Sequence, residues 1–170
     1  MFGHIETRTA EADEALRRIH ELAPAVNGAL SQIKKQAESG RTAHCEASAK
    51  CLKEAIKSAK LPKDYTDEAT DAVDTILLHA FMKATSIASR AAIEAAMKDE
   101  IERRAMKIKE ARAQLAGAIR YKAPQEFRRK CERMLETALF SGGIRAKGPT
   151  RAKPDDTMLE DEGFMEMARA

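Results

Sequence analysis

The fold is decided by residues 63–116, which read KDYTDEATDAVDTILLHAFMKATSIASRAAIEAAMKDEIERRAMKIKEARAQLA. These 54 residues contain neither Gly nor Pro, and most are residue types that lose little free energy on entering a helix. A continuous helix of this length would reach roughly 80 Å at about 1.5 Å per residue, which is longer than a compact domain of this mass. The stretch therefore predicts a helix that either folds back on itself or lies beside partner helices.

The apolar pattern of this stretch slips between Met97 and Glu100. Asp99, with Glu102 three residues later, matches part of a capping box and would start a new helix. A continuous helix is nevertheless favoured over a hairpin, because Asp and Lys break helices weakly and helix ends usually carry Gly. We expect helical segments over 66–97 and 99–122, and the sequence leaves both connections open.

Two heptad seams precede this stretch. The first lies in a helix predicted over 9–38, with Thr9 as its N-cap, in which Pro24 predicts either a kink or a junction of two helices. The second lies in a helix predicted over 42–60. Spacings of four and three residues place the apolar side chains of each seam on one face, as in coiled coils. The seam residues are Ala12, Leu16, Ile19, Ala23, Val26, Leu30, Ile33 and Ala37 in the first helix, and Cys45, Ala49, Leu52, Ile56 and Ala59 in the second.

The fifth predicted helix covers residues 124–140. Pro124 is a favoured first helical residue, and Ser141-Gly142-Gly143 is expected to end the helix. Further Gly and Pro residues follow, so residues 141–170 predict a flexible, disordered tail that is first basic and then acidic. The predicted fold class is therefore all-α: an elongated, coiled-coil-like helical bundle of about four to five helices over 1–140, followed by that tail.

Charge is unevenly distributed along the chain. Residues 100–153 hold 15 Lys and Arg against six Glu, for a net charge of +9, whereas the last 17 residues carry −5. Such a basic segment attracts polyanions, and an acidic tail can mask it. A solvated helix surface followed by a solubilising tail explains the same pattern and is favoured. The candidate phosphate-contacting residues are Arg128, Arg129, Lys130, Arg133, Arg145, Lys147, Arg151 and Lys153.

No motif in the chain predicts catalysis, a metal or a cofactor. On a helix, His44 and Cys51 share a face but stand two turns apart, roughly 10 Å, which is too far for one zinc ion. No Glu lies three residues before any of the four histidines, which argues against a di-iron site of the ferritin type. The glycine-lysine order of phosphate-binding loops is also absent. We therefore expect no enzyme, no metal and no cofactor, although an active site assembled from scattered residues would leave no such pattern.

The cysteines and the N-terminus predict a cytoplasmic protein. Three cysteines, an odd number, with no secretory signal indicate reduced thiols. No apolar run approaches the roughly 18 residues that a membrane-spanning helix needs, so no transmembrane segment is predicted.

Composition supplies one resemblance. Trp is absent, and aromatic residues make up 4% of the chain. In this Ala-rich, aromatic-poor helical make-up the chain resembles small bacterial coiled-coil accessory proteins, such as granule-coating, phage-structural and plasmid-transfer components. The likeness lies in composition alone and assigns no role to any residue.

Two functions fit these features. The leading prediction is a non-enzymatic helical scaffold or adaptor that forms a homo-oligomer and binds a protein partner. The alternative is a nucleic-acid-binding accessory protein that uses the basic segment 100–153, with the acidic tail modulating binding. An intramolecular bundle would use the same seams, so the sequence leaves oligomerisation open. The predicted self-association residues are Leu16, Ile19, Val26, Leu30, Ile33, Leu52 and Ile56, and the partner-docking residues of the tail, if it is not an inert end, are Met158, Leu159, Phe164 and Met165.

Overall fold

The structure is a computed structural model that describes the backbone of residues 3–144 and the side chains of residues 10–141. This part of the chain consists of five α-helices and contains no β-strand, which confirms the predicted all-α fold class. The helices are α1 (Gly3–Glu38), α2 (Thr42–Ser58), α3 (Lys63–Met97), α4 (Ile101–Arg120) and α5 (Gln125–Ile144).

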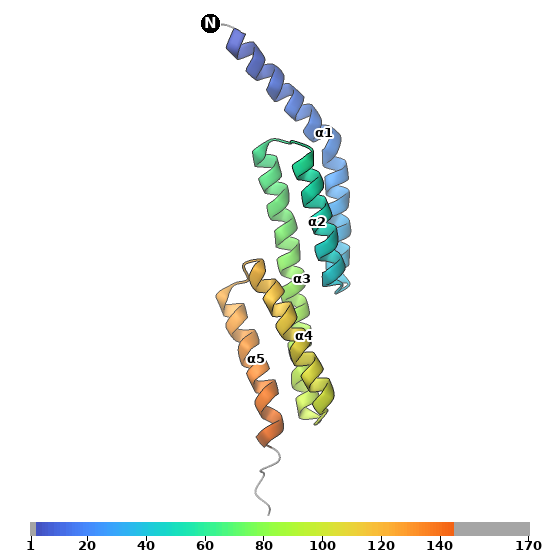
Figure 1. Ribbon diagram of the computed structural model, residues 1–170, viewed down its shortest axis with the longest axis vertical. Helices are drawn as coiled ribbons and strands as arrows, with labels where there is room; N and C mark the ends of the chain where they lie inside the picture. The colour runs from blue at the N-terminus through green and yellow to red at the C-terminus, as the bar shows by residue number, and fades with distance from the viewer. Residues whose placement is uncertain (1–2, 145–170) are drawn as a thin grey trace, which may run out of the picture.

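Helix α3 is shared by two three-helix units (Figure 1). Helices α1 and α2 pack against its N-terminal half, and α4 and α5 pack against its C-terminal half. With 35 residues, α3 is roughly 50 Å long. The molecule is therefore elongated, and the N-terminal half of α1 extends beyond the α2–α3 turn (Figure 1).

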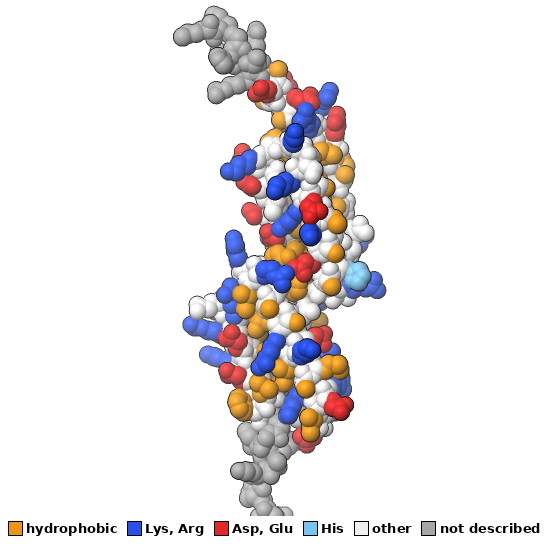
Figure 2. Space-filling view, in the orientation of Figure 1, with side chains coloured by type: hydrophobic (Ala, Val, Ile, Leu, Met, Phe, Trp, Pro, Cys, Tyr) orange, Lys and Arg blue, Asp and Glu red, His pale blue; other side chains and the backbone are white. Residues whose placement is uncertain are grey.

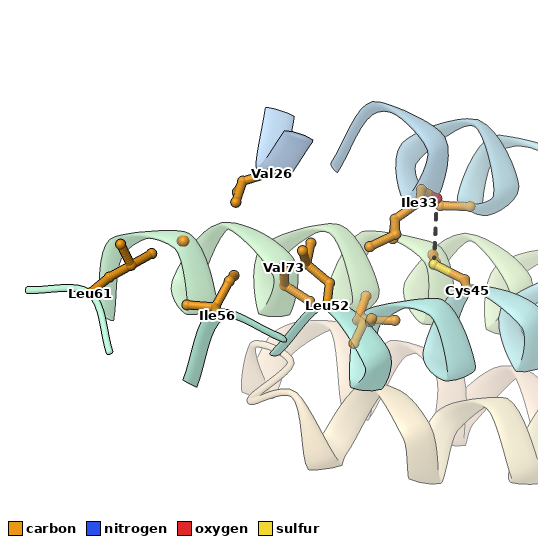
Figure 3. Close-up of a cluster of buried hydrophobic side chains, with 12 residues drawn as sticks. Val26, Ile33, Cys45, Leu52, Ile56, Leu61 and Val73 are labelled. Carbon is orange, nitrogen blue, oxygen red and sulfur yellow. Dashed lines mark hydrogen bonds between the residues drawn. The ribbon is translucent and has the colours of Figure 1, made fainter. Parts of the chain in front are cut away.

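The core of the first unit joins the seams of α1 and α2 to the apolar face of α3. Ile33 of α1, Cys45 of α2 and Val73 of α3 are almost completely buried, and Figure 3 shows them converging between the three helices. Spacings of three and four residues keep the apolar side chains of each helix on one face, so three such faces enclose a core. Its members are Val26, Ile33, Ala37, Cys45, Ala49, Leu52, Ile56, Leu61, Ala69, Val73, Leu77 and Ala80.

The core of the second unit is built largely from alanine. Small side chains let helices approach closely, and two larger aliphatic residues fill the remaining space. Each alanine removes little apolar surface from water, so this unit depends on many close contacts rather than on a few bulky ones. The cluster consists of Ala88, Ala92, Ile108, Ala111, Leu135 and Ala138.

A cluster around Phe81 lies where the two units meet. The Phe81 ring stacks on Tyr121, with ring centres 5.7 Å apart, and packs beside Ala118 and Ala123. Gly117 of α4 lies directly against the ring: a Cβ added there would stand 2.9 Å from Phe81 Cγ and closer still to the ring edge. The absence of a side chain at Gly117 is therefore what lets α4 pass so close to Phe81.

Helices α3 and α4 form a hairpin, so the favoured expectation of one continuous helix is wrong. Helix α3 ends at Met97, and Asp99 adopts left-handed backbone with a φ of 54°. The N–H of Glu100 donates to Ala95 O at 3.0 Å and the N–H of Asp99 to Ala96 O at 3.3 Å, the Schellman pattern of helix ends. Asp99 therefore ends α3 and is not the N-cap of α4. Folding back buries the apolar faces of both helices, which outweighs the roughly 1–2 kcal/mol that left-handed backbone costs a non-glycine residue.

Three further helix ends differ from the predictions by more than two residues. Helix α1 already contains Thr9, and it continues through Pro24 with a bend along its length (Figure 1). Helix α3 begins at Lys63, three residues before its predicted start. Helix α5 continues through Ser141-Gly142-Gly143 to Ile144, because Gly disfavours a helix by only about 1 kcal/mol. The remainder of the predicted tail, from residue 145 onward, lies outside the described residues.

Gly117→Ala is expected to lower the free energy of unfolding by about 1–3 kcal/mol, because overpacking against Phe81 outweighs the gain in helix propensity. Gly28→Ala is the matched control, since a Cβ at Gly28 of α1 would meet nothing within 4 Å. That substitution should raise the free energy of unfolding by roughly 0.5–1 kcal/mol. Urea unfolding followed by circular dichroism measures both changes. Equal stabilisation by the two substitutions would contradict the close approach of α4 to Phe81.

Candidate functional site

Two of the three thiols are buried in the helical cores. Burial raises the pKa of the Cys45 thiol, the charge of Glu46 raises it further, and the thiol donates a hydrogen bond to Ile33 O at 3.6 Å. Burial also raises the pKa of Cys131, so both thiols stay protonated near neutral pH and are weak nucleophiles. Cys51 is exposed. Among the residues that the structure describes, no three His, Cys, Asp or Glu side chains come together as metal ligands.

Most of the predicted self-association seam lies inside the core of the chain itself. Four of its residues are buried in the first unit: Val26, Ile33, Leu52 and Ile56. Ile19 and Leu30 pack, partly buried, against the same core. Leu16 differs from all of them, because 54% of its surface is exposed. The seam therefore serves the intramolecular bundle over most of its length and is open in the N-terminal half of α1.

Followed toward its N-terminus, α1 passes the turn between α2 and α3 and then extends beyond the bundle. An open cavity of about 510 Å³ separates α1 residues between Ala10 and Arg18 from Lys60, Leu61 and Pro62 of the turn. Beyond this point, Figure 1 shows α1 projecting from the first unit. The apolar stripe that is buried in the C-terminal half of α1 thus continues onto an N-terminal segment that the first unit does not cover.

Charged side chains on this segment of α1 pair within the helix. Arg18 Nε donates to Glu14 Oε1 at 3.1 Å. Arg17 lies 3.4 Å from Glu14 and 3.7 Å from Glu21. These i,i+3 and i,i+4 pairs support the helix modestly and partly neutralise the charges beside the open stripe.

The basic residues of α5 divide into one structural arginine and three that face solvent. Arg128 is partly buried, and its Nε donates to Ala123 O at 2.7 Å, which fastens the start of α5 to the α4–α5 turn. Arg129, Lys130 and Arg133 are exposed and form no ion pair within the described part of the chain. We call these three residues the groove bases.

The groove bases line an open groove of about 530 Å³ between α3 and α5. Ile93 of α3 and Met134 of α5 supply its apolar part, and Glu126 and Thr137 complete the lining. Figure 2 shows Lys and Arg side chains interspersed with apolar ones over the second unit. The structure thus brings together three of the predicted phosphate-contacting residues and uses Arg128 elsewhere. The predicted residues that lie outside the described part are Arg145, Lys147, Arg151, Lys153, Met158, Leu159, Phe164 and Met165.

A polar network links α2 to the end of α4 where the two units meet. Glu46 accepts hydrogen bonds from Arg120 Nη1 at 2.6 Å and from the Tyr121 hydroxyl at 3.0 Å. Lys53 Nζ of α2 pairs with Asp74 of α3 at 2.5 Å, and both line the same open cavity of about 450 Å³ as Arg120 and Tyr121. The two Glu46 contacts join the first unit to the second, whereas the Lys53–Asp74 pair joins α2 to α3 within the first unit.

Sequence reasoning did not predict this network, because its partners are far apart in the chain. Glu46 and Tyr121 are separated by 75 positions, so no local periodicity relates them. One signal was present: Gly117 stands isolated within a helical pattern, which often marks close packing by a bulky neighbour. That signal locates the junction but does not name Phe81 or Glu46.

The network changes the titration of Tyr121. Burial, the hydrogen bond to Glu46 and the Glu46 charge raise the pKa of Tyr121 to about 12. An unfolded tyrosine titrates at about 10. Because the folded-state pKa is the higher one, the stability that the neutral phenol contributes is fully present below pH 10 and is lost as the pH rises toward 12.

We found no match to this chain among protein-family models, curated proteins or solved structures. No helix of the described residues is both long and apolar enough to cross a membrane. Function is inferred from two surfaces of the molecule: the open end of the α1 seam and the groove beside α5.

A Tyr65→Phe variant leaves Tyr121 as the only tyrosine of the chain. Its tyrosinate absorbance is expected to titrate with a midpoint of about 12. Adding Glu46→Gln should move the midpoint toward 10, because the charge that opposes ionisation is removed. Circular dichroism recorded at each pH checks that the helices persist. A midpoint near 10 in the variant that keeps Glu46 would contradict the Tyr121–Glu46 contact.

Proposed function

We propose that this protein is a non-enzymatic helical scaffold or adaptor that self-associates through the projecting half of α1. The exposure of Leu16 carries the proposal. Leu16 belongs to the same heptad stripe as Val26 and Ile33, yet it is 54% exposed whereas they are buried. A stripe that is covered by helices over one half and open over the other supports docking of a further helix.

Two copies can meet through this stripe as a pair of helices. Leu16 is the large apolar side chain of the stripe that is exposed on this part of α1. Burying one such side chain completely stabilises an association by about 1.5–3 kcal/mol. The nearby arginines pair with acids of their own helix, so they oppose the approach of a second copy only weakly. An interface this small favours weak, reversible association rather than an obligate dimer.

The shape and the thiols support the rest of this proposal. The projecting end of α1 and the end of α5 lie at opposite ends of an elongated molecule (Figure 1), so a partner protein and a second copy can bind without competing. The proposed location is the cytoplasm, and the unpaired, buried Cys45 and Cys131 are in keeping with a reducing compartment.

Leu16→Asp is expected to abolish self-association, because a carboxylate would have to be buried in the helix pair. Sedimentation velocity over a concentration series should show a dimer or larger species for the parent chain at the upper end of the series, and a monomer for the variant throughout. Ile87→Asp is the matched control: Ile87 is 58% exposed, similar to Leu16, but lies on α3. Circular dichroism should show the parental helix content in both variants.

Two results would refute this proposal. A parent chain that sediments as a monomer at all concentrations would rule out self-association. A dimer that persists in Leu16→Asp but is lost in Ile87→Asp would place the interface on α3.

A second candidate function, a nucleic-acid-binding accessory protein, is favoured by the groove bases. Phosphate binding needs cations that are not already neutralised by nearby acids. On α4, Arg103 pairs with Glu100 at 2.8 Å and Lys107 with Glu110 at 2.6 Å, whereas the groove bases have no such partners within the described residues. Lys109 and Arg112 of α4 also form no ion pair within the described residues, but the three groove bases lie together along one open groove. The groove is therefore the proposed phosphate-binding surface, with the acidic tail modulating binding.

Replacing the three groove bases by Ala should weaken nucleic-acid binding and reduce the slope of log affinity against log salt by roughly 2–3. The matched control, which also removes three charges, combines Lys35→Ala, Lys50→Ala and Lys57→Ala, since these lysines are exposed on α1 and α2. A gel-shift titration of single- and double-stranded nucleic acid across a salt series measures the slope. Absence of binding by the parent chain at low salt would refute this candidate, and an equal effect of the control would show that general charge, not the groove, is responsible.

A further inference from the structure

The groove beside α5 combines positive charge with an apolar floor. The groove bases outnumber its one acid, Glu126, and Ile93 and Met134 contribute apolar surface. Such a lining suits a segment that carries acids and large apolar side chains together. We propose that its occupant is the chain's own C-terminal segment, residues 155–170.

The composition of this segment is complementary to the groove. Residues 155–170 contain six acids and one base, Arg169. Ionic contacts formed beside apolar surface are stronger than fully exposed ones, because less water screens them. Apolar contacts with the groove floor would add to the attraction. The large apolar residues of the segment are Met158, Leu159, Phe164, Met165 and Met167.

The connecting chain is long enough to return to the groove. Helix α5 ends at Ile144, and Thr137 marks the near end of the groove. The distance between these two positions along the helix is about 10 Å at about 1.5 Å per residue. Residues 145–154 can span up to about 33–36 Å, so they permit the chain to reverse direction and bring residue 155 beside Thr137.

The reversed direction also matches the order of charges. From Thr137 to Glu126 the groove extends about 17 Å along α5. The six acids of the segment come first and would pass the groove bases. If the segment docks as a helix, residues 155–169 span about 21 Å at about 1.5 Å per residue, close to the length of the groove, and Arg169 then lies near Glu126 at the far end. The opposite direction would place Arg169 near Arg133 and is disfavoured by like-charge repulsion.

The preceding residues 145–153 are excluded as the occupant by their charge. They carry Arg145, Lys147, Arg151 and Lys153 and no acid. Close to the groove bases these cations would repel. The basic stretch therefore acts as the connection, and the acidic residues beyond it supply the contact. This inference concerns contacts within one chain, and it holds whether or not α1 self-associates or the groove binds nucleic acid.

Disulfide capture in the full-length chain tests the proposal. Thr137→Cys in the groove is combined with Thr157→Cys in the segment, in a Cys51→Ser background that removes the exposed native thiol. Glu132→Cys with Thr157→Cys is the matched control, because Glu132 is exposed on the same helix but does not line the groove. The control also removes the negative charge of Glu132, which would speed capture of the acidic segment. A faster rate at Thr137→Cys would therefore be seen despite a control that favours capture.

Brief treatment with a mild thiol oxidant at low protein concentration, followed by mass spectrometry, measures the rate of the intramolecular disulfide. We expect capture at Thr137→Cys to be about 10-fold faster than at Glu132→Cys, corresponding to about 1.4 kcal/mol. The difference should collapse at about 1 M salt, where charges are screened within about 3 Å. It should also collapse when Arg129→Glu and Arg133→Glu are added.

Three outcomes would overturn the proposal: equal capture rates at the two positions, capture only between two chains, or a difference that neither salt nor charge reversal affects. Circular dichroism of each variant checks that α5 is retained. Because disulfide capture needs neither a second copy nor nucleic acid, its failure is distinguishable from failure of the scaffold or of nucleic-acid binding.

Discussion

Every part of this molecule depends on burying one long helix, α3, along its whole length. No single helix covers both halves of α3: α2, α4 and α5 are shorter than its 35 residues, and α1, although as long, is offset and extends past the α2–α3 turn. The chain covers it in two stages: α1 and α2 pack on the first half, and α4 and α5 pack on the second. The elongated shape and the separation of the two surfaces at opposite ends both follow from this division.

The two units are held together by contacts around the middle of α3. Phe81 supplies a bulky ring, Gly117 removes the side chain that would collide with it, and Tyr121 stacks on its face. The hydroxyl of Tyr121 then donates to Glu46 of the first unit. A large apolar contact and a charge-assisted hydrogen bond thus meet at one place. The continuous helix α3 sets the direction of the second unit relative to the first, and this small set of side chains adds contacts between α2 and the end of α4.

The surfaces proposed to bind partners are those that packing within the two units leaves uncovered. The seam of α1 continues past the end of α2, which leaves Leu16 without the core that surrounds Ile33. Helix α5 buries one face against α3 and turns its groove bases outward. Binding at either surface would leave the cores unchanged, as the proposed adaptor role requires.

The amino-acid sequence by itself determined that the chain is helical and where most apolar faces lie, because helix propensity and three-four spacing are local properties. It also identified Arg129, Lys130 and Arg133 as a basic cluster. It did not determine the hairpin at Asp99: local preference at that position is weak, and the choice depended on burying α3 against α4. Nor did it separate an intramolecular seam from an intermolecular one, because both need the same heptads. Only the tertiary structure decided that Val26 and Ile33 are internal, that Leu16 is open and that Glu46 meets Tyr121, since each depends on where distant helices pack.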